Sequence, residues 1–246
     1  MAFSCSKCGG NLLMVSGKLF CPICRNFVSS NSNGSLSSLK SSPLKQMSGE
    51  DLFEKVRPGV VELETETSRG SGFVLSDRFI LTCAHCVTDS KGYIVSSLDV
   101  KFENGFGKAK PICVGTQTKV KSKQVDLAVI ELQQRIPIDA KILKLADYST
   151  VKNAQTIYAI GNARGLGICI TRGIVSDRLR EAEDGRTHML IDCNAFHGNS
   201  GCPILNDDGE VIGILDQGFD EYDNGVNYAI PSCIAIDFLK QNGIRV

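Results

Sequence analysis

Short β-rich runs separated by Gly, Asn or Asp are the feature that most constrains how this chain can fold. They begin near residue 49 and recur along the rest of the chain without a repeat of fixed length. Many short strands of this kind predict an all-β sandwich or a pair of barrels. The runs are Val60–Leu63, Gly72–Leu75, Phe79–Leu81, Val125–Leu132, Ile157–Ile160 and Val211–Leu215.

Two segments of this region carry helix signals instead. We expect helices over Gly49–Val56, where the β-rich part begins, and over Pro231–Gln241, near its end. Pro231 suits a helix start because proline fixes its own φ, and Gly243 suits the position just after a helix end.

The N-terminal part carries a different pattern, two Cys-x-x-Cys pairs separated by 12 residues. Such pairs can each bend around one metal ion, and Gly9 and Gly10 supply the positive φ that this turn requires. Apolar residues at 12–15 and 19–20 fit a short hairpin between the pairs. A redox-active pair or two disulfides are the alternatives, but a thioredoxin-like pair needs a βαβ unit. We therefore expect a zinc ribbon with one structural Zn²⁺ held by Cys5, Cys8, Cys21 and Cys24.

Composition divides the chain into the same parts. Nine of the twenty residues in 29–48 are Ser, which indicates a flexible linker between a ribbon at 1–28 and a large domain at 49–246. All five charged residues in 1–48 are basic, whereas the whole chain is neutral with 27 basic and 27 acidic residues, so the large domain is net acidic. This asymmetry supports two modules.

Several classes of protein are excluded by the sequence. No apolar run reaches the ~20 residues that span a bilayer, and the N-terminus lacks the apolar stretch of a secretory signal. Zero net charge argues against a binder that depends on bulk attraction to nucleic acid. We expect a cytoplasmic protein without a membrane partner.

Three histidines make the search for a catalytic base short. His85 directly follows a predicted strand, and His188 lies on a predicted strand, where a structural role is expected. Ser200 lies in a Gly-Asn-Ser-Gly turn whose backbone N–H groups can bind a developing oxyanion. A serine hydroxyl needs a base such as His85, and the imidazole needs a carboxylate, for which Asp126 is the candidate. Taken singly, these residues could equally be a core histidine, a loop cap and an ordinary turn.

The order His85, Asp126, Ser200 and its flanking residues resemble the chymotrypsin-fold serine proteases, specifically their HtrA (Deg) branch. The similarity covers about residues 50–241. It rests on Gly70–Val74, Leu81–Val87, Val125–Ile130, Ala159–Gly167, Gly173–Ser176, Asp192–Pro203 and Asn227–Ser232.

The resemblance implies two antiparallel β-barrels that divide near 135–150, with the active site between them. It implies a serine endopeptidase that forms an acyl-enzyme with the triad His85, Asp126 and Ser200. The oxyanion hole would be formed by Gly198, Asn199 and Ser200. An uncharged, small to medium residue is expected at P1, because no Asp occupies the pocket floor. The implied substrate pocket comprises Asn194, Asp216, Gln217, Gly218, Asn227 and Tyr228.

The chain also departs from the family pattern. It ends soon after the last predicted helix, so we expect no PDZ domain, and the ribbon becomes the candidate for recruiting a protein partner. Phe196 and His197 stand where the family often has Asn-Pro. Without an evident activation site, we hypothesise that activity depends on ordering of the 161–167 and 176–184 loops.

Seven cysteines lie outside the ribbon, an odd number that indicates buried reduced thiols rather than a disulfide framework. The sequence thus predicts an intracellular serine endopeptidase with a docking ribbon. The alternatives are a protease-fold module that holds peptides without cutting them, and a ribbon that delivers the protease to nucleic acid. The family often forms trimers, but no residue here decides the oligomeric state.

Overall fold

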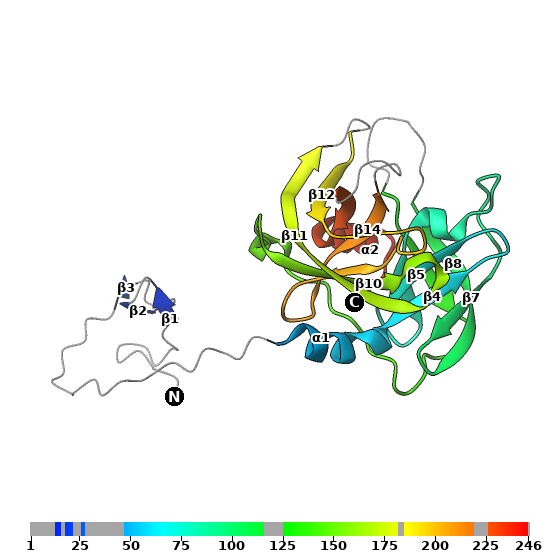
Figure 1. Cartoon of the computed structure of the whole chain (residues 1–246), viewed down its shortest axis with the longest axis horizontal. Coiled ribbons are helices and arrows are strands. Elements are labelled where there is room, and N and C mark those ends of the chain that lie inside the picture. The colour runs from blue at the N-terminus through cyan, green and yellow to red at the C-terminus, as the bar shows by residue number, and fades with distance from the viewer. Residues whose placement is uncertain are drawn as a thin grey trace. The chain divides into compact units, whose positions relative to one another are not determined.

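The structure, a computed structural model, describes residues 13–15, 18–21, 26–27, 47–115, 125–181, 185–218 and 226–245. It consists of two compact units, Met1–Leu44 and Lys45–Val246 (Figure 1). Among the described helices, none has the length and apolar character required to cross a bilayer.

The first unit contains a small antiparallel sheet in the order β1-β2-β3. Its strands are β1 (Leu13–Val15), β2 (Lys18–Cys21) and β3 (Asn26–Phe27), and Leu13 pairs with Phe20. The predicted hairpin is therefore present in the backbone. Three of the expected zinc ligands, Cys5, Cys8 and Cys24, and the side chain of Cys21 lie outside the described residues.

The second unit begins with a closed six-stranded barrel in the order β4-β5-β6-β9-β8-β7. Apolar side chains that alternate along these strands, such as Val61, Leu63, Ile80 and Ile130, fill its interior. The run that was predicted to begin at Val125 becomes a strand only at residue 128. The strands are β4 (Val60–Glu64), β5 (Arg69–Val74), β6 (Phe79–Thr82), β7 (Leu98–Phe102), β8 (Gly105–Val114) and β9 (Ala128–Leu132).

A second closed six-stranded barrel follows, in the order β10-β11-β12-β15-β14-β13. Figure 1 shows the first barrel in cyan to green and the second in yellow-green to orange. Helix α2 (Ser232–Gln241) continues directly from the last strand, with Pro231 as its N-cap. The strands are β10 (Thr156–Asn162), β11 (Ile168–Glu181), β12 (Thr187–Asp192), β13 (Pro203–Leu205), β14 (Val211–Gly218) and β15 (Val226–Pro231).

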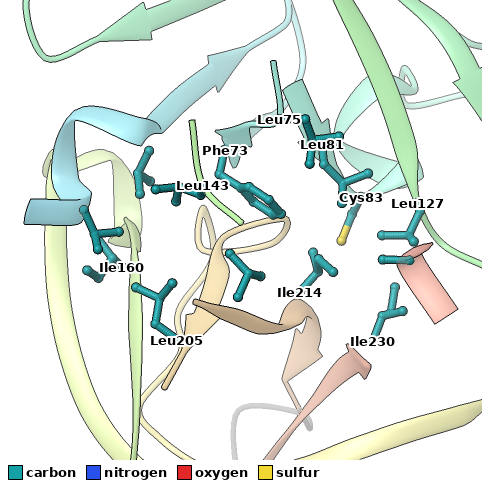
Figure 2. Packing of buried hydrophobic residues seen from close by; sticks show 14 of the residues in the cluster. Phe73, Leu75, Leu81, Cys83, Leu127, Leu143, Ile160, Leu205, Ile214 and Ile230 are labelled. Carbon is teal, nitrogen blue, oxygen red and sulfur yellow. The ribbon is translucent and has the colours of Figure 1, made fainter. Parts of the chain in front are cut away.

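A separate hydrophobic core joins the two barrels. Phe73 and Leu81 of the first barrel pack in one buried cluster with Ile160, Leu205 and Ile214 of the second (Figure 2). Each of these five side chains is fully excluded from solvent. Burial of this apolar area stabilises the docking of the barrels and fixes the relative positions of the loops at their junction.

Helix α1 (Gly49–Val56) covers one side of this shared core. Leu52 and Val56, one turn apart, bury their side chains in it, and Met47 also packs against it. The Ser48 hydroxyl accepts a hydrogen bond from the Asp51 N–H at 3.0 Å, and this bond caps the helix.

Loss of this cap gives a stability prediction. Ser48→Ala is expected to lower the free energy of unfolding by about 1 kcal/mol, because the first turn of α1 loses its side-chain acceptor. Urea denaturation followed by circular dichroism would measure the change. Ser48→Asn keeps an acceptor and should restore most of the loss. Equal destabilisation by both substitutions would show that the cap is not its cause.

Candidate active site

His85 lies on a short 3₁₀ turn, Ala84–Val87, directly after β6. The Ala84 N–H donates to the Asp126 carbonyl oxygen at 3.3 Å, so the turn is attached to the segment that enters β9. About a third of the His85 side chain is exposed, whereas that of Asp126 is buried. The imidazole is thus mostly buried against Asp126, and the rest of the ring is exposed to solvent.

A short contact joins His85 to Asp126. The imidazole Nδ1 lies 2.6 Å from Asp126 Oδ2, and the His85 backbone N–H donates to Asp126 Oδ1 at 3.0 Å. A carboxylate bound in this way favours the tautomer with the proton on Nδ1 and leaves Nε2 as the acceptor. Burial disfavours the imidazolium, but the bonds to Asp126 and Cys86 outweigh it and raise the pKa of His85 above its usual 6.5.

Ser200 lies in a tight turn between β12 and β13 that requires two glycines. Gly198 and Gly201 have φ values of 94° and 84°, in the left-handed region that favours glycine. A methyl group on Gly198 would overlap the carbonyl oxygen of Asn162, so the close approach also excludes a side chain. The Ser200 carbonyl oxygen lies 3.4 Å from the Cys86 sulfur. Because Cys86 directly follows His85 in the chain, this contact places the turn beside the segment that carries His85.

The N–H groups of this turn are used in different ways. The Asn199 N–H donates to the Phe196 carbonyl at 2.9 Å and that of Gly201 to the Leu215 carbonyl at 2.8 Å. Within residues 47–115, 125–181, 185–218 and 226–245, the N–H groups of Gly198 and Ser200 donate to no protein acceptor. Two donors on the same turn are therefore available to an oxygen from outside, whereas that of Asn199 is already bonded.

Ser71, on β5 of the first barrel, holds this turn in place. Its N–H donates to the Ser200 carbonyl at 2.9 Å, and its hydroxyl donates to the Gly198 carbonyl at 2.6 Å. The same hydroxyl accepts from the Asn162 N–H at 2.9 Å, and Thr82 Oγ1 donates to the Ser71 carbonyl at 2.6 Å. These bonds connect both barrels through one fully buried serine.

Ser71 is not among the predicted site residues, although the sequence carries a signal for its role. The residue stands between Gly70 and Gly72 and is followed by the apolar Phe73 and Val74, and side chains at both glycines would overlap neighbouring atoms. A buried hydroxyl between two glycines indicates a close backbone approach with a polar partner.

Asp216, which is predicted to line the substrate pocket, has its carboxylate in the interior. Its side chain is fully buried, and Oδ2 accepts from His188 Nε2 at 2.9 Å and from Arg186 at 3.3 Å. Ligand atoms of Cys83, His85, Asp126 and Asp216 all lie within 4.8 Å of one another. The carboxylate of Asp216 therefore lies close to that of Asp126.

The other predicted pocket residues are brought together by the barrel. Strand pairing sets Gln217 opposite Tyr228 and Gly218 opposite Asn227. Asn227 is buried and donates from Nδ2 to the Cys193 carbonyl at 2.6 Å, next to exposed Asn194. Tyr228 stacks at a tilt on His188, with ring centroids 5.0 Å apart. The predicted P1 preference stays a prediction.

Phe196 and His197 contact the loop after β10. The His197 carbonyl accepts from the Arg164 N–H at 2.7 Å, and the Arg164 guanidinium lies 4.8 Å from the centre of the Phe196 ring. Arg164 has a φ of 55°, unusual for a residue other than glycine. The 161–167 loop thus supports the turn, whereas residues 176–181 continue β11.

Cys83, His85, Asp126 and Asp216 include the donor types that zinc prefers. However, His85 and Asp126 already bond to each other, and Cys83 donates to the Leu215 carbonyl at 3.1 Å. A metal ion here would break both bonds, so the contacts favour a hydrogen-bonded cluster. The seven cysteines of the second unit are free thiols, and burial raises the pKa of Cys83 and Cys202.

Comparisons with known proteins match this fold and site. Residues 70–214 match the trypsin-like peptidase domain. The chain is 34% identical over 184 residues to a probable periplasmic serine endoprotease DegP-like protein of Halomonas elongata, covering 72% of this chain and 36% of that protein. It is 30% identical over 212 residues to the serine protease HTRA3 of Homo sapiens, covering 78% and 44%.

A mitochondrial serine protease, HTRA2 of Bos taurus, is 30% identical over 209 residues, with 78% of this chain and 42% of the relative covered. The aligned part is thus well under half of each relative's length. The family match spans most of both barrels and contains His85, Asp126 and Ser200. The chain belongs to the family of trypsin-like peptidase domains.

Proposed function

We propose that this chain is a serine endopeptidase that hydrolyses peptide bonds through Ser200, His85 and Asp126. The bonded His85–Asp126 pair carries the proposal, because it lies beside a turn that presents a serine and two available N–H groups. Similarity to named serine proteases supports the same reaction class.

The proposed reaction uses these groups in sequence. Ser200 Oγ attacks the carbonyl carbon of the scissile peptide while His85 Nε2 accepts the hydroxyl proton. The N–H groups of Gly198 and Ser200 bind the oxyanion of the tetrahedral intermediate. His85 then donates the proton to the departing amine, and water hydrolyses the acyl-enzyme by the same steps. Asp126 stabilises the imidazolium through its 2.6 Å bond to Nδ1.

Labelling with a fluorophosphonate tests the proposal directly. Wild-type chain is expected to gain the mass of one adduct, and Ser200→Ala is expected to gain none, because only an activated serine reacts. Both proteins should first show the same thermal melting. Folded wild-type chain that gains no adduct would contradict an active peptidase and favour the binding module that holds peptides without cutting them.

The raised pKa of His85 predicts the pH dependence. Because only neutral His85 accepts the serine proton, kcat/KM should rise with pH, with a midpoint above 6.5. A series of kcat/KM measurements on a peptide substrate gives the midpoint, and a value below 6.5 would contradict the geometry. The sign for stability is opposite: protonated His85 stabilises the fold below about pH 6.5, and this contribution is lost as pH rises through the folded-state pKa.

We also propose that residues 1–28 form a zinc ribbon that docks the protease on a protein partner. The spacing of Cys5, Cys8, Cys21 and Cys24 supports this, as does the antiparallel backbone of β1–β3 between and beside them. Purified chain should contain one zinc per molecule by metal analysis, and Cys21→Ser should lower that content. Ser200 labelling should survive chelation. Zinc-free wild-type chain would contradict the ribbon and leave the peptidase proposal intact.

A further inference from the structure

The pair Asp216 and His188 has no part in the reaction described above, yet Asp216 lies close to Asp126 in the same buried cluster. Asp216 follows the middle of β14 and His188 lies on β12, and both side chains are almost completely excluded from solvent. His188 Nε2 lies 2.9 Å from Asp216 Oδ2, and Arg186 adds a contact to the same oxygen at 3.3 Å. Both donors bond to Oδ2 of this buried carboxyl group, so the bonding of its other oxygen, Oδ1, remains to be explained.

Asp216 Oδ1 is that unexplained atom. It is buried, and among the described residues no hydrogen-bond donor reaches it. Ligand atoms of Asp126 and Asp216 lie within 4.8 Å of each other, so the two carboxyl groups are neighbours in one buried cluster. Two ionised carboxylates so close in a buried site repel each other strongly. A single proton between them removes the repulsion and supplies the missing donor.

Two further observations support a neutral Asp216. Burial and Asp126 raise the pKa of its carboxyl group, although the bond from His188 acts in the opposite direction. His188 Nδ1 is also buried without a partner among the described residues, which fits an acceptor lone pair better than an unsatisfied N–H. His188 then donates from Nε2 without carrying a charge. The positive charge of Arg186 balances the negative charge of one buried carboxylate. The charged and titratable groups around Asp216 are Asp126, His85, Cys83, His188 and Arg186.

We propose that Asp216 is a positioning residue for Asp126: as a carboxylic acid it donates its Oδ1 proton to the Asp126 carboxylate, while His188 and Arg186 hold its Oδ2. This proposal rests on the proposed peptidase function, because it assigns Asp216 to the support of that triad. The donated bond fixes the carboxylate that orients His85, and it leaves the cluster with a single buried negative charge.

Activity measurements test the role through two replacements of similar size. Asp216→Leu removes the donor and is expected to lower kcat/KM by about 100-fold, the cost of a misplaced catalytic group. Asp216→Asn can donate to Asp126 and accept at the other atom, so it should recover kcat/KM to within about tenfold of wild type. Asp99→Leu replaces an exposed carboxylate on β7. It is the matched control and should leave kcat/KM unchanged. Full activity of folded Asp216→Leu would overturn the proposal.

The pH profile of Asp216→Asn separates the two protonation states. If Asp216 is neutral in wild type, the amide changes no charge and the midpoint of the rising limb stays in place. If Asp216 is ionised, the amide removes a negative charge near His85, and the midpoint should fall by about one pH unit or more. A fall of that size would overturn the proposal, whether or not Asp216→Leu folds.

A readout that needs no activity completes the test. In Ser200→Ala chain carrying ¹³C-labelled aspartate carboxyl groups, the Asp216 signal can be assigned from its absence in the added Asp216→Asn variant. We expect it to have the shift of a carboxylic acid at about pH 6, where an ordinary aspartate is ionised. An ionised signal there would overturn the proposal. The carboxyl signal is measured in a variant without the nucleophile and does not depend on activity. The result therefore stands even if fluorophosphonate labelling of wild type fails.

Discussion

Asp126→Asn is expected to lower kcat/KM by about 10⁴-fold while leaving the fold intact. The amide oxygen can still accept the His85 backbone N–H, which bonds to Asp126 Oδ1 at 3.0 Å. The amide nitrogen, however, faces Nδ1, where a 2.6 Å contact now joins imidazole and carboxylate. Two donors cannot share that bond, so His85 turns to the tautomer whose proton is on Nε2 and which cannot accept from Ser200.

Steady-state kinetics on a peptide substrate would measure this loss, with thermal melting as the check on folding. Asp99→Asn is the matched control, since that side chain is well exposed on β7 and forms an ion pair with Lys108 on the neighbouring strand. Its kcat/KM should equal that of wild type. A loss of less than about tenfold in Asp126→Asn would show that Asp126 does not set the His85 tautomer during catalysis.

Gly198→Ala is expected to lower kcat by about 10²- to 10³-fold, the typical cost of losing one oxyanion-hole donor. The added methyl group would overlap the Asn162 carbonyl oxygen, which belongs to backbone and cannot rotate away. The turn must therefore shift, and the N–H groups of Gly198 and Ser200 move from their present direction. Because the donors act mainly in the transition state, KM should change less than kcat.

Gly92→Ala provides the matched control for backbone strain. Gly92 has a φ of 82°, close to the 94° of Gly198, but no atom lies within 4 Å of a methyl group placed there. Both variants should lose stability through the strained φ, whereas only Gly198→Ala should lose kcat. If the two variants lose kcat equally, strain rather than displacement of the N–H donors is responsible.

Local signals in the sequence predicted the parts of the structure that depend on local chemistry. Helix α1 occupies the predicted Gly49–Val56, because its cap and apolar spacing lie within a few residues of each other. The two glycines around Ser200 predicted a tight turn for the same reason, and both have positive φ. The barrel pair was implied by the family resemblance, and the twelve strands close into two barrels as that resemblance implied.

Contacts between distant segments could not be predicted in this way. His188 and Asp216 meet although β15 lies between their strands in the barrel order, so the contact depends on the register of three strands and on side-chain length. The contacts of the Asp216 carboxylate in the interior could therefore not be inferred from its place in the sequence, and its pocket role stays a prediction. The bonds of Ser71 to the Ser200 turn depend similarly on the docking of two barrels.

Ser71 has a consequence for how this protein loses activity. The turn that carries Ser200 belongs to the second barrel, but its carbonyl groups are bonded to a serine of the first. Neither half of the molecule therefore contains a complete catalytic apparatus, and a fragment with only the second barrel would retain the nucleophile without its anchor. Separation of the two halves would therefore end catalysis even where each barrel kept its own strands.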